Sequence, residues 1–178
     1  MLIALYFWKF YRKWKSKGID ILFVNTLMYV YLSFVVYFTL MPVITSLPFI
    51  LNHGYHPINF TPFIDVTFGR GDFMRQVGLN IIMTIPFGLL FPLVKSQKTS
   101  FFKTLAYTFL LSLTIEIIQP LISDYRIADI TDLINNVLGG AIGYVLYIAF
   151  RPLLTAALRR ISKLGRPSGQ EPFSSTEA

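Results

Sequence analysis

The sequence predicts an all-α membrane protein, a polytopic bundle of four transmembrane helices preceded by an amphipathic helix at the membrane surface, with both termini in the cytoplasm. Two observations support this fold class. Of the 178 residues, 54% are hydrophobic and only 14% are charged, whereas about a quarter of the residues in a typical soluble domain are charged. The apolar residues also form four runs that approach the roughly 20 helical residues needed to cross the hydrocarbon core.

The predicted orientation rests on where the basic residues fall. The 16 Lys and Arg gather mainly in residues 9–17 before the first apolar run, 95–103 between the second and third, and 151–166 after the fourth. Basic residues in short loops beside membrane spans mark the cytoplasmic side. With four spans, all three stretches fall on one side. The net charge of +7 could suggest that the protein binds nucleic acid, but the same distribution argues against that partner.

The chain does not divide into separate globular domains, but its ends differ from its middle. Residues 1–20 are expected to form the amphipathic basic helix on the inner leaflet, because Lys9 and Lys13 share one helical face while aromatic residues share another. The charges there follow the apolar stretch, and no small-residue cleavage site appears, which argues against a signal peptide. Residues 21–158 form the predicted transmembrane domain, and residues 165–178 have the composition of a disordered cytoplasmic tail.

The four spans are predicted at about residues 21–41, 77–94, 105–122 and 133–150. The first is long enough to cross roughly 30 Å of hydrocarbon at about 1.5 Å per residue. Pro86 and Pro92 are expected to kink the second, which neighbouring helices can tolerate in a membrane. The external segment 42–76 is long for a structureless loop, so we expect it to pack over the outer face or dip into it.

Polar side chains inside a span are costly, so each invites a functional interpretation. One stripe at helical spacing in the third span comprises Thr108, Ser112, Glu116 and Gln119. A second stripe, at the start of the fourth span, comprises Asp129, Asp132, Asn136, Gly139 and Gly143. Asp129 or Asp132 can cap the helix N-terminus. The Gly-x-x-x-Gly pair is expected to let another helix approach closely.

These polar groups are expected to meet near the outer leaflet, where the third span ends and the fourth begins. The second span adds Asn80 in its outer half, the external segment adds Asn59, and Arg126 in the last connection can pair with any of three carboxylates. The predicted ligand-binding or functional pocket comprises Asn59, Asn80, Ser112, Glu116, Gln119, Arg126, Asp129, Asp132 and Asn136. The alternative is that these groups merely hold the bundle together. That interpretation is less favoured, because such contacts average only about 0.6 kcal/mol.

The order and spacing of these residues resemble the VanZ-like family of bacterial membrane proteins. The family pattern combines an Asn and a Pro-x-Gly element, a Ser-x-x-x-Glu-x-x-Gln helix, and an Arg-x-x-Asp-x-x-Asp-x-x-x-Asn-x-x-Gly-x-x-x-Gly segment. The matching residues are Asn80, Pro86, Gly88, Ser112, Glu116, Gln119, Arg126, Asp129, Asp132, Asn136, Gly139 and Gly143, with Asn59, Pro62 and Phe63 upstream. The similarity covers roughly residues 20–150.

The resemblance implies a protein of the bacterial plasma membrane with a part in antibiotic resistance. The family is named after a protein associated with resistance to the lipoglycopeptide teicoplanin, an antibiotic type that acts on cell-wall precursors at the outer face and inserts a lipid tail there. We therefore expect a non-enzymatic protein that limits lipoglycopeptide action. Besides membrane lipids, its expected partner at the outer leaflet is the lipid-anchored drug or a cell-wall lipid precursor.

The alternative is an intramembrane enzyme that modifies a lipid-linked cell-wall or headgroup substrate. Glu116, Asp129 and Asp132 supply carboxylates for acid–base work or for a divalent metal, and His53 and His56 can join them. No nucleophile with an adjacent base is recognisable, so we favour the non-enzymatic role, with no cofactor and no metal site. A channel or transporter is disfavoured, because the inner halves of the last three spans are mostly apolar.

Overall fold

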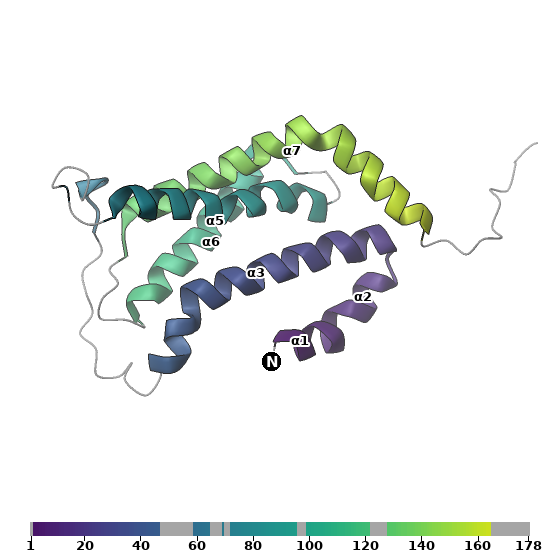
Figure 1. The fold of residues 1–178 in the computed structure, drawn as a ribbon, viewed down its shortest axis with the longest axis horizontal. Coiled ribbons are helices and arrows are strands. Elements are labelled where there is room, and N and C mark those ends of the chain that lie inside the picture. Colours follow the sequence, from purple (N-terminus) through teal and green to yellow (C-terminus); the bar gives the residue numbers. More distant parts are fainter. Residues whose placement is uncertain are drawn as a thin grey trace, which may run out of the picture.

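The computed structural model describes residues 2–46, 59–64, 69, 72–95, 99–121 and 128–164, with the side chains of 40–46 and 121 excepted. Within these ranges the chain is helical, and extended backbone pairs only in an isolated bridge. Four helices are long and apolar enough to cross a membrane. They are α3 (Ile19–Ser46), α5 (Phe73–Val94), α6 (Phe101–Ile118) and α7 (Ile130–Leu164) (Figure 1). The predicted membrane helix bundle is therefore confirmed.

The helices differ from the predicted spans at their ends. α5 begins at Phe73 and continues as one helix through both of its prolines. α6 ends at Ile118 and passes into a 3₁₀ turn, Gln119–Leu121. α7 is 35 residues long and runs well beyond the predicted end at residue 150, through Pro152 to Leu164. Hydropathy detects only the apolar part of a helix. It therefore did not predict that these helices continue into polar and basic residues.

A helical segment precedes α3 and folds back along it (Figure 1). It comprises α1 (Leu2–Leu5), a π-helical stretch (Tyr6–Tyr11) and α2 (Arg12–Lys15). Gly18 turns the chain with φ of +130°, a conformation that favours glycine. Tyr29 of α3 donates its hydroxyl to the Leu2 carbonyl at 2.7 Å, and its ring packs against Phe10 and Trp14. The segment therefore contacts α3 through aromatic side chains, and its position at the membrane surface stays a prediction.

Glycines bring α5 and α7 into the most extensive helix contact of the bundle. A Cβ atom on Gly139 would collide with the Ile81 carbonyl, and one on Gly143 would collide with the Ile85 carbonyl. Gly88 of α5 meets the backbone of α7 in the same way. Small residues allow this close approach of helix backbones in membranes. None of the three positions has room for a side chain.

α3 and α6 complete the bundle around this pair. α3 packs against α5 through Met28, Phe87 and Phe91. The hydroxyl of Tyr31 in α3 donates to the Met83 carbonyl of α5 at 2.9 Å. α6 lies mainly against α7, where buried threonine and serine side chains replace apolar ones.

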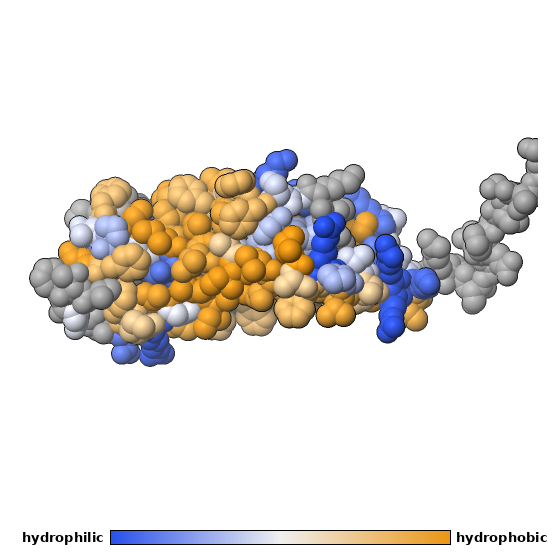
Figure 2. All heavy atoms as spheres, turned by 90° about the horizontal axis from the view of Figure 1, so that it is seen from above, coloured by the Kyte–Doolittle hydropathy of each residue, from blue (hydrophilic) through white to orange (hydrophobic). Residues whose placement is uncertain are grey.

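The two ends of the bundle differ in charge. Figure 2 shows an apolar band along the molecule, with hydrophilic side chains gathered toward the end where α7 finishes. We call this the basic end, defined by Lys95, Lys103, Arg151, Arg159, Arg160 and Lys163. At the opposite end α6 finishes, α7 begins, and the described residues 59–64 lie against them.

Candidate functional site

Asp129 organises the start of α7. It immediately precedes the helix, and its Oδ1 accepts a hydrogen bond from the Thr131 backbone N–H at 2.7 Å. This is helix N-capping, which satisfies one of the free amides of the first turn. The other carboxylate oxygen, Oδ2, accepts from Nδ2 of Asn59 at 2.9 Å. The negative charge also lies where the helix dipole favours it.

Asn59 fixes a distant stretch of chain to the same place. Its backbone forms a parallel bridge with Asp129: its N–H donates to the Ala128 carbonyl at 2.9 Å, and its own carbonyl accepts from Ile130 N–H at 3.1 Å. Four residues on, the Phe63 N–H donates to Thr131 Oγ1 at 2.9 Å. Residues 59–64, which we call the outer turn, are therefore held on α7 by backbone and side-chain bonds together.

The outer turn has its own internal order. Asn59 Oδ1 accepts from the Thr61 N–H at 3.1 Å, which is the hydrogen bond of an Asx turn. Phe63 adopts φ of +56°, an uncommon conformation for a residue with a side chain. In this conformation its N–H donates to Thr131 Oγ1, and its ring contacts that of Phe73, with centroids 6.3 Å apart.

Glu116 joins α6 to this arrangement. Its side chain is 5% exposed in the last turn of α6. Oε2 accepts from the Asp129 backbone N–H at 3.2 Å. Burying a carboxylate costs free energy unless it is hydrogen-bonded. This hydrogen bond also joins the end of α6 to the start of α7. Asn59, Glu116, Asp129 and Thr131 together form what we call the polar cluster.

A second polar layer lies further along α7, beneath the polar cluster. Asn136 is 1% exposed, and its Nδ2 donates to Ser112 Oγ of α6 at 2.8 Å. Its backbone carbonyl accepts from Thr84 Oγ1 of α5 at 2.7 Å. One residue of α7 thereby bonds to both neighbouring helices. Asn136 Oδ1 and the buried Asn135 Nδ2 have no hydrogen-bond partner among the described protein atoms.

The predicted pocket residues divide into four groups. Asn59, Glu116 and Asp129 meet directly, and Ser112 and Asn136 meet in the layer below. Gln119 is buried in the 3₁₀ turn after α6, and Asp132 lies part-exposed in the first turn of α7. Asn80 is part-exposed on α5, where its carbonyl accepts from Thr84 Oγ1 at 3.2 Å. Arg126, His53 and His56 lie outside the described residues.

Three residues of these two layers are missing from the predicted pocket. Thr84 stands four residues after Asn80, so helical periodicity already placed it on the polar face of α5. Asn135 is 2% exposed and precedes Asn136 in α7. It lies off the helical face that the spacing of Asp129, Asp132 and Asn136 indicates, so that spacing did not predict it. Thr131 receives a bond from the outer turn, and no local sequence pattern reports a contact across 68 residues.

The chemistry of the site is that of hydrogen bonding and negative charge. Both oxygens of Asp129 accept bonds that hold the chain in place. Across the part of the chain that the structure describes, no three carboxylates or histidines converge closely enough to hold a metal ion. The arrangement fixes the outer turn over the ends of two helices and places a buried carboxylate beneath it.

Comparison with known proteins identifies the family. A family model described as VanZ/LLP1 matches residues 28–151, a stretch that contains the polar cluster, the layer below it and the close-packed glycines. This chain belongs to the VanZ-like family. The resemblance seen in the sequence is thereby confirmed.

A curated relative supports the VanZ-like assignment. The chain is 35% identical to protein VanZ of Enterococcus faecium over 121 residues, which cover 68% of this chain and 71% of that one. No solved structure gave a significant match.

Proposed function

We propose that this VanZ-like protein limits the action of teicoplanin-type lipoglycopeptides at the outer face of the bacterial cell membrane, and that the polar cluster is its functional site. Family membership and the similarity to protein VanZ support a VanZ-like resistance protein. Four membrane-length helices support a multi-pass membrane protein. The link to teicoplanin comes from the protein after which the family is named.

The proposed outer position of the site follows from charge. The polar cluster lies at the end of the bundle opposite the basic end, which carries Lys95, Lys103 and the cations of α7. Basic residues beside membrane spans are retained in the cytoplasm. The polar cluster and the outer turn then face outward, and both termini lie in the cytoplasm.

The observation that carries the proposal is the attachment of the outer turn to the polar cluster. Asn59 and Phe63 fix the turn to α7, while the Phe60 side chain is 73% exposed on the turn. The exposed Phe60 ring supplies an apolar contact beside the polar groups of Asn59 and Asp129. A hydrogen-bonded turn with an exposed ring above a buried carboxylate suits a partner with both a lipid tail and polar groups. A lipid-anchored drug and a lipid-linked cell-wall precursor both have this chemistry.

A binding role fits the geometry better than catalysis. Both oxygens of Asp129 and Oε2 of Glu116 accept hydrogen bonds that hold the fold. A general base must lie within hydrogen-bond reach of the proton that it removes from the substrate. The described carboxylate contacts instead organise a surface.

The proposal is tested by expressing the full chain in a teicoplanin-susceptible Gram-positive strain and measuring minimal inhibitory concentrations. The expected result is a several-fold rise for teicoplanin relative to the empty vector, with vancomycin susceptibility unchanged. Vancomycin is the matched drug because it shares the cell-wall target and lacks the lipid tail. No change for teicoplanin, with the protein detected in the membrane fraction, would overturn the proposal.

A further inference from the structure

The last part of α7 has no role in the proposed function, and its composition differs from the rest of the helix. The 35 residues of α7 span about 52 Å at 1.5 Å per residue, well beyond the roughly 30 Å hydrocarbon core. Residues 130–150 are apolar enough to cross that core alone. Residues 151–164, which we call the α7 arm, contain four cationic side chains and no Asp or Glu.

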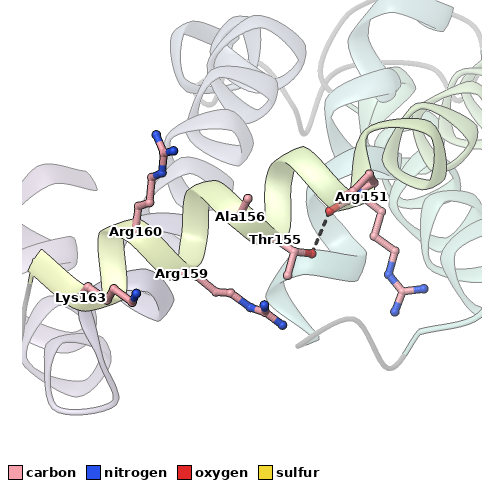
Figure 3. A pocket seen from close by; sticks show the side chains of 7 residues that line it. Arg151, Thr155, Ala156, Arg159, Arg160 and Lys163 are labelled. Carbon is pink, nitrogen blue, oxygen red and sulfur yellow. Dashed lines mark hydrogen bonds between the residues drawn. The ribbon is translucent and has the colours of Figure 1, made fainter.

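A hollow of about 720 Å³ lies along the α7 arm. Its lining residues are Arg151, Pro152, Thr155, Ala156, Arg159, Arg160 and Lys163. The compact side chains of Pro152, Thr155 and Ala156 lie between the longer ones of Arg151 and Arg159 along the helix. Figure 3 shows Arg151 and Arg159 extending to the same side of the helix, while Arg160 extends to the opposite side.

The spacing of the two arginines suits one anion between them. Arg151 and Arg159 stand two four-residue steps apart, which is about 12 Å along a helix axis. Thr155 lies midway, and its short side chain donates its hydroxyl to the Arg151 carbonyl at 2.8 Å. Guanidinium groups bind phosphate through paired N–H donors, with a geometric match that a lysine ammonium lacks.

Charge and apolar surface together point to a lipid rather than a free phosphate. The neighbouring hollow of about 300 Å³ contributes a single carboxylate, Asp20 of α3, near Arg159. The four cations of the first hollow outnumber it. Phe150 and Leu153, beside the hollow, are 50% and 67% exposed. Positive charge next to exposed apolar side chains, where a span ends, matches a phosphate with acyl chains attached.

We propose that the α7 arm binds the phosphate of an anionic glycerophospholipid. Arg151 and Arg159 contact the phosphate, and the acyl chains lie along Phe150 and Leu153. A bound lipid would then anchor the end of α7 at the membrane surface. This site lies at the basic end, away from the polar cluster, and its test does not depend on antibiotic resistance.

The test is competition between two lipids on the purified full-length protein in detergent. Dioleoylphosphatidylglycerol and dioleoylphosphatidylcholine are added in equal amounts, and the bound lipids are counted by native mass spectrometry. The wild type is expected to retain phosphatidylglycerol preferentially. The double variant R151Q/R159Q is expected to bind it about 25-fold more weakly, since each of the two cations near a lipid surface contributes a factor of about five. R151K/R159K, which keeps the charge, should show an intermediate loss.

The matched control removes the same charge elsewhere. Arg12 and Lys13 are exposed cations of α2 outside the hollow, and R12Q/K13Q should leave phosphatidylglycerol retention unchanged. An equal loss in that control would overturn the proposal in favour of diffuse attraction. Displacement of both lipids by millimolar sodium phosphate would overturn it in favour of a site for free phosphate. Circular dichroism checks that each variant remains folded.

Discussion

At the scale of single residues, Glu116 raises the question of why a charge is buried there. The hydrogen bond that Oε2 accepts from the Asp129 N–H needs only an acceptor, which a glutamine amide also supplies. Charge near a helix N-terminus gains about 0.3–1 kcal/mol, whereas burying a carboxylate costs several kcal/mol before its bonds are counted. Asp129 and Asp132 already supply that negative charge. We propose that the carboxylate of Glu116 serves the proposed function of the polar cluster.

We predict that Glu116→Gln abolishes protection against teicoplanin while the protein stays folded. The amide keeps an acceptor for the Asp129 N–H, removes the charge and replaces the other oxygen with an NH₂ donor. The measurement is the minimal inhibitory concentration, which should fall to the empty-vector level at equal amounts of membrane protein. Thr114→Val is the matched control, because Thr114 is exposed on another face of α6 and donates to the Leu110 carbonyl. Full protection by the Gln variant would show that the acceptor alone matters.

At the scale of helices, the contact between α5 and α7 positions the polar layers. Gly143 lies against the Ile85 carbonyl, with the Gly88 Cα 2.9 Å from where its Cβ would stand. Backbone atoms cannot move aside as the end of a flexible side chain can. This close approach also brings Asn136 within reach of Thr84 on α5. The same contact therefore sets both the packing and the polar layer.

We predict that Gly143→Ala destabilises the protein by about 1–3 kcal/mol, the usual cost of overpacking. Gly78→Ala is the matched control, because Gly78 also lies in a membrane helix and nothing stands within 4 Å of its Cβ position. It should be neutral or stabilising, since alanine favours helix by about 0.5–1 kcal/mol. Thermal unfolding in detergent, followed by circular dichroism, compares the two. Equal midpoints would contradict the packing described for α5 and α7.

The sequence predicted the helices better than their contacts. Hydropathy located all four spans, and the helical period placed Ser112 and Asn136 on faces that do meet. The sequence did not predict that α7 continues through the α7 arm, because the basic residues of the arm interrupt the apolar run. The docking of the outer turn was also beyond reach. Asn59 and Asp129 are 70 residues apart, and no periodicity reports a contact of that range.

At the scale of the whole molecule, the two ends of the bundle have different chemistry. One end carries the outer turn and the polar cluster, whose hydrogen bonds fix a rigid surface. The other carries the basic end and the hollow of the α7 arm. An asymmetric membrane provides matching partners, with lipid-anchored ligands outside and a negatively charged leaflet inside. The proposed function therefore depends on which end faces outward.

The outward position of the outer turn is tested most directly by cysteine labelling on intact cells. The chain contains no cysteine, so single substitutions give an unambiguous signal. Phe60→Cys reports on the outer turn and Leu164→Cys on the basic end, where the native side chains are 73% and 85% exposed. A membrane-impermeant maleimide should label Phe60→Cys in intact cells and Leu164→Cys only after the membrane is permeabilised. Labelling of Leu164→Cys alone in intact cells would contradict the orientation and place the polar cluster in the cytoplasm.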